Sequence, residues 1–84
     1  MSDLNVAEKV IGTKQTLKAV RDGKALRVVL AEDTEAAIKD EILAVCEEAG
    51  VIVEAYASKS ALGEACGIER AAAVVTLLKS SQGV

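Results

Sequence analysis

The chain of 84 residues contains no histidine and no proline, and Tyr56 is its only aromatic residue. The lack of histidine removes the commonest general base of enzymes. Without histidine or a CxxC pair, one chain cannot supply the four ligands of a structural zinc site. A lone tyrosine also argues against proteins that stack single-stranded bases on several aromatic rings. We therefore expect no enzymatic activity, no metal and no cofactor.

Long apolar runs are absent too. No run approaches the roughly 18 residues that a membrane-spanning helix requires. Residues 1–5 carry neither the basic start nor the apolar stretch of a secretory signal. We expect a cytoplasmic protein with no membrane partner. The length suits one domain, so residues 1–84 are expected to form a single, monomeric domain.

The two cysteines, Cys46 and Cys66, lie in apolar helical patterns, beside Val45 and Ala65. In such surroundings a free cysteine behaves as a small hydrophobic residue. We expect both cysteines to be reduced thiols in an aliphatic core, because the apolar content is almost entirely alanine, valine, isoleucine and leucine.

The net charge of −3 hides an uneven distribution of charge. Residues 32–54 hold eight acidic residues against the single Lys39, whereas six of the ten basic residues lie early, at Lys9, Lys14, Lys18, Arg21, Lys24 and Arg27. Salt screens charges beyond about 8 to 10 Å, so a polyanion responds to the local patch rather than to the total. The early basic segment is therefore a candidate contact for nucleic acid.

Apolar periodicity predicts alternating helices and strands. A short helix is expected after Asp3, using Leu4, Val6 and Val10, and others over 13–22, from Asp33 or Thr34 to Gly50, and from Ser58 or Ser60 to Gly67. Strands are expected at 10–12, 26–31, 51–56 and 72–78, with 26–31 central because it is a continuous β-branched run. This pattern predicts an α/β fold, a three-layer α/β/α sandwich with a four-stranded mixed sheet. The expected core comprises Val28, Val29, Leu30, Ile38, Ile42, Val53, Leu62, Val74 and Val75.

The segment from Gly12 to Lys18 carries the strongest candidate chemistry. Thr13 is a good N-cap, and the N–H groups of a helix start favour phosphate. Lys14, Lys18 and Arg21 recur at i, i+4 and i+7 and so form one basic stripe, and Gln15 has an amide suited to a base edge. The alternative interpretation is a solvated helix face with a threonine cap.

A second segment runs from Leu62 to Ala73. Gly63 interrupts a helical pattern at a cost of about 1 kcal/mol relative to alanine, so a packing reason is expected. Gly67 is expected to turn the chain, which leaves Ile68 and Arg70 in a loop before a buried strand. The alternative is that Ile68 only makes the hydrophobic contact that accompanies a helix C-cap.

Together, Ile11-Gly12-Thr13-Lys14-Gln15-Thr16, Leu30-Ala31-Glu32-Asp33, Leu62-Gly63 and Ala65-Cys66-Gly67-Ile68-Glu69 resemble the L-seven-Ae family of kink-turn-binding ribosomal proteins, above all its short bacterial members. The resemblance implies an α/β/α sandwich that binds RNA sharply bent by a bulge beside tandem sheared G·A pairs, in association with the ribosome. It also implies that Gly12, Thr13, Lys14, Gln15 and Lys18 line the kinked groove, and that Ile68, Glu69, Arg70 and Ala71 lie against the bulged nucleotides. Arg21 is expected to contact RNA phosphate because it belongs to the basic stripe.

The chain departs from that family in two places. Archaeal members carry Gly-x-Asn-Glu where this chain has Gly-Thr-Lys-Gln, so a neutral amide replaces a carboxylate at Gln15. The proline that usually follows the aspartate matching Asp33 is missing, which affects the start of a helix. A rival function is a protein-interaction module that uses an acidic helix face comprising Glu35, Asp40, Glu41, Glu47 and Glu48.

Overall fold

A computed structural model describes residues 8–79, in which four strands and three helices alternate. In chain order these are β1 (Lys9–Ile11), α2 (Thr13–Arg21), β2 (Ala25–Ala31), α3 (Ala36–Ala49), β3 (Val53–Tyr56), α4 (Lys59–Ala65) and β4 (Val74–Leu78). The helix expected after Asp3 falls mostly outside the described residues, and Val10, assigned to that helix, belongs to β1 instead.

The sheet is mixed, with the strand order β1-β4-β2-β3. β4 runs antiparallel to both of its neighbours, β1 and β2, while β3 runs parallel to β2 at the edge. The prediction that β2 is central is confirmed. β3 begins at Val53 and β4 at Val74, so each is two residues shorter than expected.

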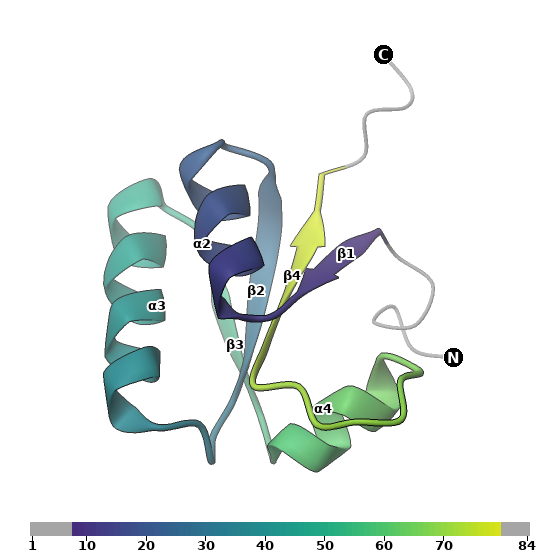
Figure 1. Ribbon diagram of the computed structural model, residues 1–84. Helices are drawn as coiled ribbons and strands as arrows, with labels where there is room; N and C mark the ends of the chain where they lie inside the picture. The colour runs from purple at the N-terminus through teal and green to yellow at the C-terminus, as the bar shows by residue number, and fades with distance from the viewer. Residues whose placement is uncertain (1–7, 80–84) are drawn as a thin grey trace.

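Helices cover both faces of this sheet, which confirms the three-layer α/β/α sandwich. Figure 1 shows α2 and α3 side by side on one face and α4 across the other. Alternate residues of β2 and β4 point to opposite faces, so two apolar clusters form. Val28, Leu30 and Val74 face α2 and α3, whereas Val29 and Val75 face α4. No helix within residues 8–79 is long and apolar enough to span a membrane.

The expected core is largely confirmed, since seven of its nine residues are buried. The exceptions are Ile38 and Val53, which are only half-buried although both pack against the cluster beneath α2 and α3. Val53 lies on the edge strand β3, where no further strand covers it. Both cysteines are free and buried, Cys46 in the cluster beneath α3 and Cys66 in the one beneath α4, so the sheet separates them.

The predicted helix ends are confirmed, because Gly23, Gly50 and Gly67 all have positive φ and follow the last turns of α2, α3 and α4. The predicted start of α2 at Thr13 is confirmed, but two predicted N-caps are wrong. The N-cap of α2 is Gly12, and Thr13 is already helical. The N-cap of α3 is Glu35, while Asp33 and Thr34 bind elsewhere. For α4 the cap is Ser58 rather than Ser60, and its hydroxyl accepts from the Ala61 N–H at 3.0 Å.

Candidate nucleic-acid interface

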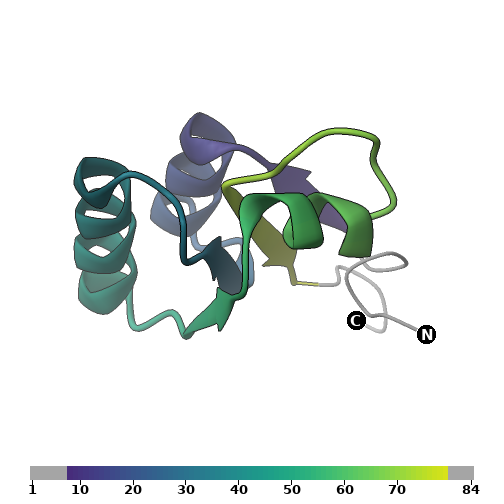
Figure 2. The same ribbon diagram turned by 90° about the horizontal axis from the view of Figure 1, so that it is seen from below.

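The two segments singled out in the sequence meet at one end of the sheet, where β1 finishes and β4 begins. β1 and β4 are antiparallel, so the end of β1 at Ile11 lies opposite Val75 near the start of β4. The pairing continues one residue further, since the Gly12 N–H donates to the Val74 carbonyl at 3.0 Å. Figure 2 shows the segment that follows α4 returning to β4 beside the start of α2. The helix start and the loop of residues 68–71 therefore flank the same corner of the molecule.

The start of α2 offers unpaired donors. Gly12 has φ 112° and ψ 159°, a conformation that is essentially restricted to glycine. Its carbonyl accepts the first intrahelical bond, from the Thr16 N–H at 3.0 Å, so the preceding N–H groups of Thr13, Lys14 and Gln15 have no partner within the helix. No side chain caps this end and no acidic residue lies in the first turn. The positive end of the helix dipole therefore faces solvent.

The polar residues of α2 point outward as the sequence predicts. Lys14, Gln15 and Lys18 are exposed, and neither lysine forms an ion pair with a carboxylate of residues 8–79. The opposite face of α2 is buried at Thr16, Ala19 and Val20 and half-buried at Leu17. The two exposed lysines add positive charge to that of the helix start.

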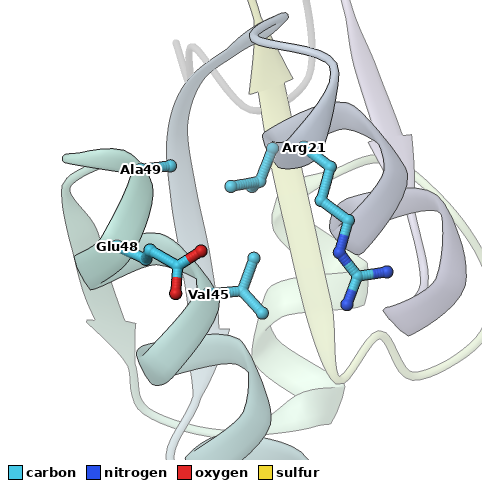
Figure 3. Close-up of a pocket in the computed structure, with 5 residues that line it drawn as sticks. Arg21, Val45, Glu48 and Ala49 are labelled. Atoms are coloured by element: carbon cyan, nitrogen blue, oxygen red, sulfur yellow. The ribbon is translucent and has the colours of Figure 1, made fainter.

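The structure does not bring Arg21 to the same corner. Arg21 lies at the end of α2, about 12 Å along the helix axis from Thr13. With Val20 it lines an open pocket of about 370 Å³ between α2 and α3, opposite Val45, Glu48 and Ala49. Figure 3 shows the Arg21 guanidinium and the Glu48 carboxylate on opposite sides of this pocket. Among the predicted site residues on α2, Arg21 is the farthest along the helix axis from the helix start.

The 68–71 loop is held against α4 by backbone contacts. A Cβ on Gly63 would collide with the carbonyl of Arg70, which is the packing reason expected for a glycine inside a helix. The Ile68 N–H donates to the Gly63 carbonyl at 3.1 Å and the Gly67 N–H to the Glu64 carbonyl at 3.0 Å. This bond pair is the Schellman motif, which ends helices with a left-handed glycine. The loop thus has a defined shape without any ligand.

The side chains of the loop differ in their exposure. Ile68 is half-buried and packs against the apolar cluster beneath α4, so the predicted C-cap contact does form. Glu69, Arg70 and Ala71 are exposed. Together with Ser60 and Glu64 these four residues line an open pocket of about 270 Å³. Ile68 therefore has one apolar side on the core and another on the pocket.

Sequence reasoning missed a third segment at this end of the sheet, the turn between β2 and α3. The Thr34 hydroxyl donates to the Ala73 carbonyl at 3.2 Å, and the same carbonyl accepts from the Ala31 N–H at 2.9 Å. Asp33 accepts from the Lys59 N–H at 2.8 Å, which ties the turn to the start of α4. A threonine and an aspartate that precede a helix usually predict an N-cap. Nothing in the sequence indicates that they form these long-range contacts instead.

Other chemistry is sparse in the described part of the chain. Burial raises the pKa of the Cys46 thiol, and burial also raises the pKa of the Cys66 thiol, against a smaller opposing effect of the Lys9 charge. Raised pKa values disfavour the reactive thiolate. Within residues 8–79, no group of three carboxylate or cysteine side chains could hold a metal ion. The acidic residues of α3, comprising Asp40, Glu41, Glu47 and Glu48, are all exposed, as is its N-cap Glu35.

Comparison with known proteins adds independent information. Residues 4–83 match the family described as "Ribosomal protein L7Ae/L30e/S12e/Gadd45 family". An RNA-binding protein of Geobacillus sp. (strain WCH70) is 41% identical over 76 residues, which cover 90% of this chain and 93% of that protein. The RNA-binding protein YbxF of Geobacillus stearothermophilus shows the same identity and coverage.

Solved structures agree with these sequence matches. A protein of unknown function from Bacillus halodurans superposes with a TM-score of 0.85 at 25% identity, covering 92% of this chain and 81% of that one. The 15.5 kD RNA-binding protein of Giardia lamblia superposes with a TM-score of 0.81 at 32% identity, covering 87% of this chain and 62% of that one. Since the family match spans almost the whole length and the fold agrees, the chain belongs to the ribosomal protein L7Ae/L30e/S12e/Gadd45 family.

Proposed function

We propose that this chain is an RNA-binding protein that recognises a kinked element, with a bulge beside sheared G·A pairs, and acts by binding alone. The observation that supports this best is the meeting of the uncapped start of α2 with the 68–71 loop at one end of the sheet. A surface with two differently shaped parts at a corner suits a bent RNA better than a straight duplex. The relatives named as RNA-binding proteins support the same assignment.

In this proposal each part has its own role. The N–H groups of Thr13 to Gln15 and the Lys14 ammonium bind phosphates, which favour a helix start. The Gln15 amide both donates and accepts, so it reads the base edges exposed by the G·A pairs. Ile68 covers an unstacked bulged nucleotide with apolar surface, and Arg70 lies near its phosphate. We also infer that the whole chain acts as one monomeric domain and that it associates with the ribosome.

The test compares two RNAs that differ only at the G·A pairs, one kinked and the other with those pairs converted to Watson–Crick pairs. We expect the parent protein to prefer the kinked RNA. Gln15→Ala should lose about 1 to 3 kcal/mol of that preference, because a good base contact is worth this much. Lys14→Ala should instead weaken binding to both RNAs and reduce the salt slope by about 0.9 for one lost phosphate contact.

Lys39→Ala is the matched control for Lys14→Ala, because it removes the same charge from α3, where the Lys39 ammonium donates to the Glu32 carbonyl at 3.2 Å. Equal affinities of the parent for the two RNAs would refute the proposed specificity. The rival acidic-face function predicts that a protein partner bound through α3 is not displaced by RNA, whereas RNA displaces anything bound at the start of α2.

A further inference from the structure

A second feature of α2 extends from the corner described above toward the end of the helix. The side of the helix that faces β1 and β4 borders a small open pocket of about 200 Å³. Gln15 and Lys18 of α2 line it, and so does Lys24, which follows the helix. Val10 of β1, Ala19 of α2 and Leu78 of β4 form its apolar part, and Asp22 also lines it. Two lysines, one glutamine, one aspartate and three aliphatic residues thus line one space.

The position of Lys24 is fixed by the backbone. Gly23 has φ 73°, which turns the chain back alongside the last turn of α2. The Lys24 N–H donates to the Ala19 carbonyl at 2.9 Å, and the Lys24 carbonyl accepts from the Lys79 N–H at 2.9 Å. Lys24 is exposed and forms no ion pair with a carboxylate of the described residues. Its ammonium is therefore available to an anion beside that of Lys18.

We propose that this pocket binds a backbone phosphate of the RNA stem next to the kink, with Lys24 as an additional RNA-binding residue. The inference rests on the proposed function, because Gln15 and Lys18 also belong to the proposed interface and the same RNA strand must reach them. Lys18 and Lys24 supply the charge, and Val10 and Leu78 contact the carbon atoms of the sugar. The Asp22 carboxylate opposes this binding, but the pocket keeps a net positive charge because Lys18 and Lys24 outnumber it.

The geometry makes the stem, rather than the bend, the ligand of this pocket. Lys18 lies about 7.5 Å along the helix axis from Thr13, and Lys24 lies beyond it. An RNA whose kink sits at the start of α2 reaches Lys24 only through paired nucleotides that extend away from the kink. Binding should therefore depend on Lys24 when the stem is long, and not when it is short.

The experiment measures affinity and salt slope for a kinked RNA whose stems are shortened one base pair at a time. Lys24→Ala should weaken binding to the long RNA by about fivefold at 0.15 M salt and reduce the slope by about 0.9, which corresponds to one phosphate contact. Asp22→Asn should strengthen binding to the long RNA. Both effects should vanish once the stem no longer reaches the pocket. Lys39→Ala and Asp40→Asn are the charge-matched controls on α3, and melting curves establish that each variant is folded.

The outcomes separate this inference from the proposed function. If the parent prefers the kinked RNA but Lys24→Ala and Asp22→Asn bind the long RNA as the parent does, the pocket is not a phosphate site and the proposed function stands. If the parent shows no preference for the kink, yet Lys24→Ala still weakens binding to a straight duplex, the proposed specificity fails and the phosphate site stands. Equal effects of the variants at all stem lengths would also overturn the assignment to the stem.

Discussion

The two halves of the candidate interface each depend on a glycine, for opposite physical reasons. Gly12 at the start of α2 has open space around it, but its φ of 112° excludes other residues. Gly63 within α4 lies in a regular helix, but the carbonyl of Arg70 occupies the place of a Cβ. The first half is thus shaped by the backbone conformation of a single residue. The second is shaped by close packing of two segments.

This difference predicts how each half fails. Strain at Gly12 is local and affects the first turn of α2, whereas a side chain at Gly63 pushes away a whole loop. Substitutions at the two positions should therefore separate damage to the helix start from damage to the loop. A third glycine, Gly50 at the end of α3, has φ 73° and open space, and serves as a control remote from the interface.

The largest effect is expected from Gly63→Ala. The added methyl group meets backbone atoms of Arg70 and Ala71, which cannot rotate aside as a side chain would. We expect a loss of about 3 kcal/mol in the free energy of unfolding, at the upper end for overpacking, and weaker RNA binding by the folded protein because the 68–71 loop moves. Urea unfolding and RNA titration measure the two effects. A variant with parental stability and affinity would show that the loop does not depend on this contact.

A smaller effect is expected from Gly12→Ala, at about 2 kcal/mol, because the conformation is strained for a residue with a Cβ. RNA affinity should also fall, since relaxing the strain moves the N–H groups at the start of α2. Gly50→Ala should cost about 1 kcal/mol with no change in the RNA affinity of the folded protein. If the two variants lower affinity equally, the conformation of Gly12 has no special part in binding.

The smallest change in stability is expected within the loop. Ile68→Ser should cost about 1 kcal/mol, because a half-buried side chain loses part of its transfer free energy, and RNA should dissociate faster. Arg70→Glu should leave the melting temperature unchanged, since Arg70 is exposed, and should slow association. Melting curves and binding kinetics of both variants decide the role of Ile68. If Ile68→Ser lowers the melting temperature but leaves the RNA dissociation rate at the parental value, Ile68 only makes the contact that accompanies the helix cap.

Much of the fold could be predicted from the sequence because the signals are local. The β-branched run of β2 and the glycines after each helix identify elements and their ends without reference to the rest of the chain. The start of α3 could not be predicted, since Asp33 bonds to Lys59, 26 positions away, instead of capping the helix. The half-buried state of Val53 depends on the strand order, which periodicity does not reveal.

The candidate site shows the same division. Motifs identify Gly12 to Lys18 and residues 68–71, but only the pairing of β1 with β4 explains why they meet. Arg21 belongs to the basic stripe by its spacing, yet it lies beside the pocket between α2 and α3. Lys24 carries no motif at all, and its place beside Lys18 follows from the turn at Gly23.

The central position of β4 also has a consequence for folding. β4 is the last strand of the described chain, yet it lies between β1 and β2, so neither half of the interface is in place until it inserts. Pairings between such distant segments form slowly. The amides of Gly12 and Ala31, which donate to Val74 and Ala73, should exchange with solvent deuterium only when the whole sheet unfolds. RNA bound across both halves should therefore slow that exchange, because it must dissociate before β4 can leave the sheet.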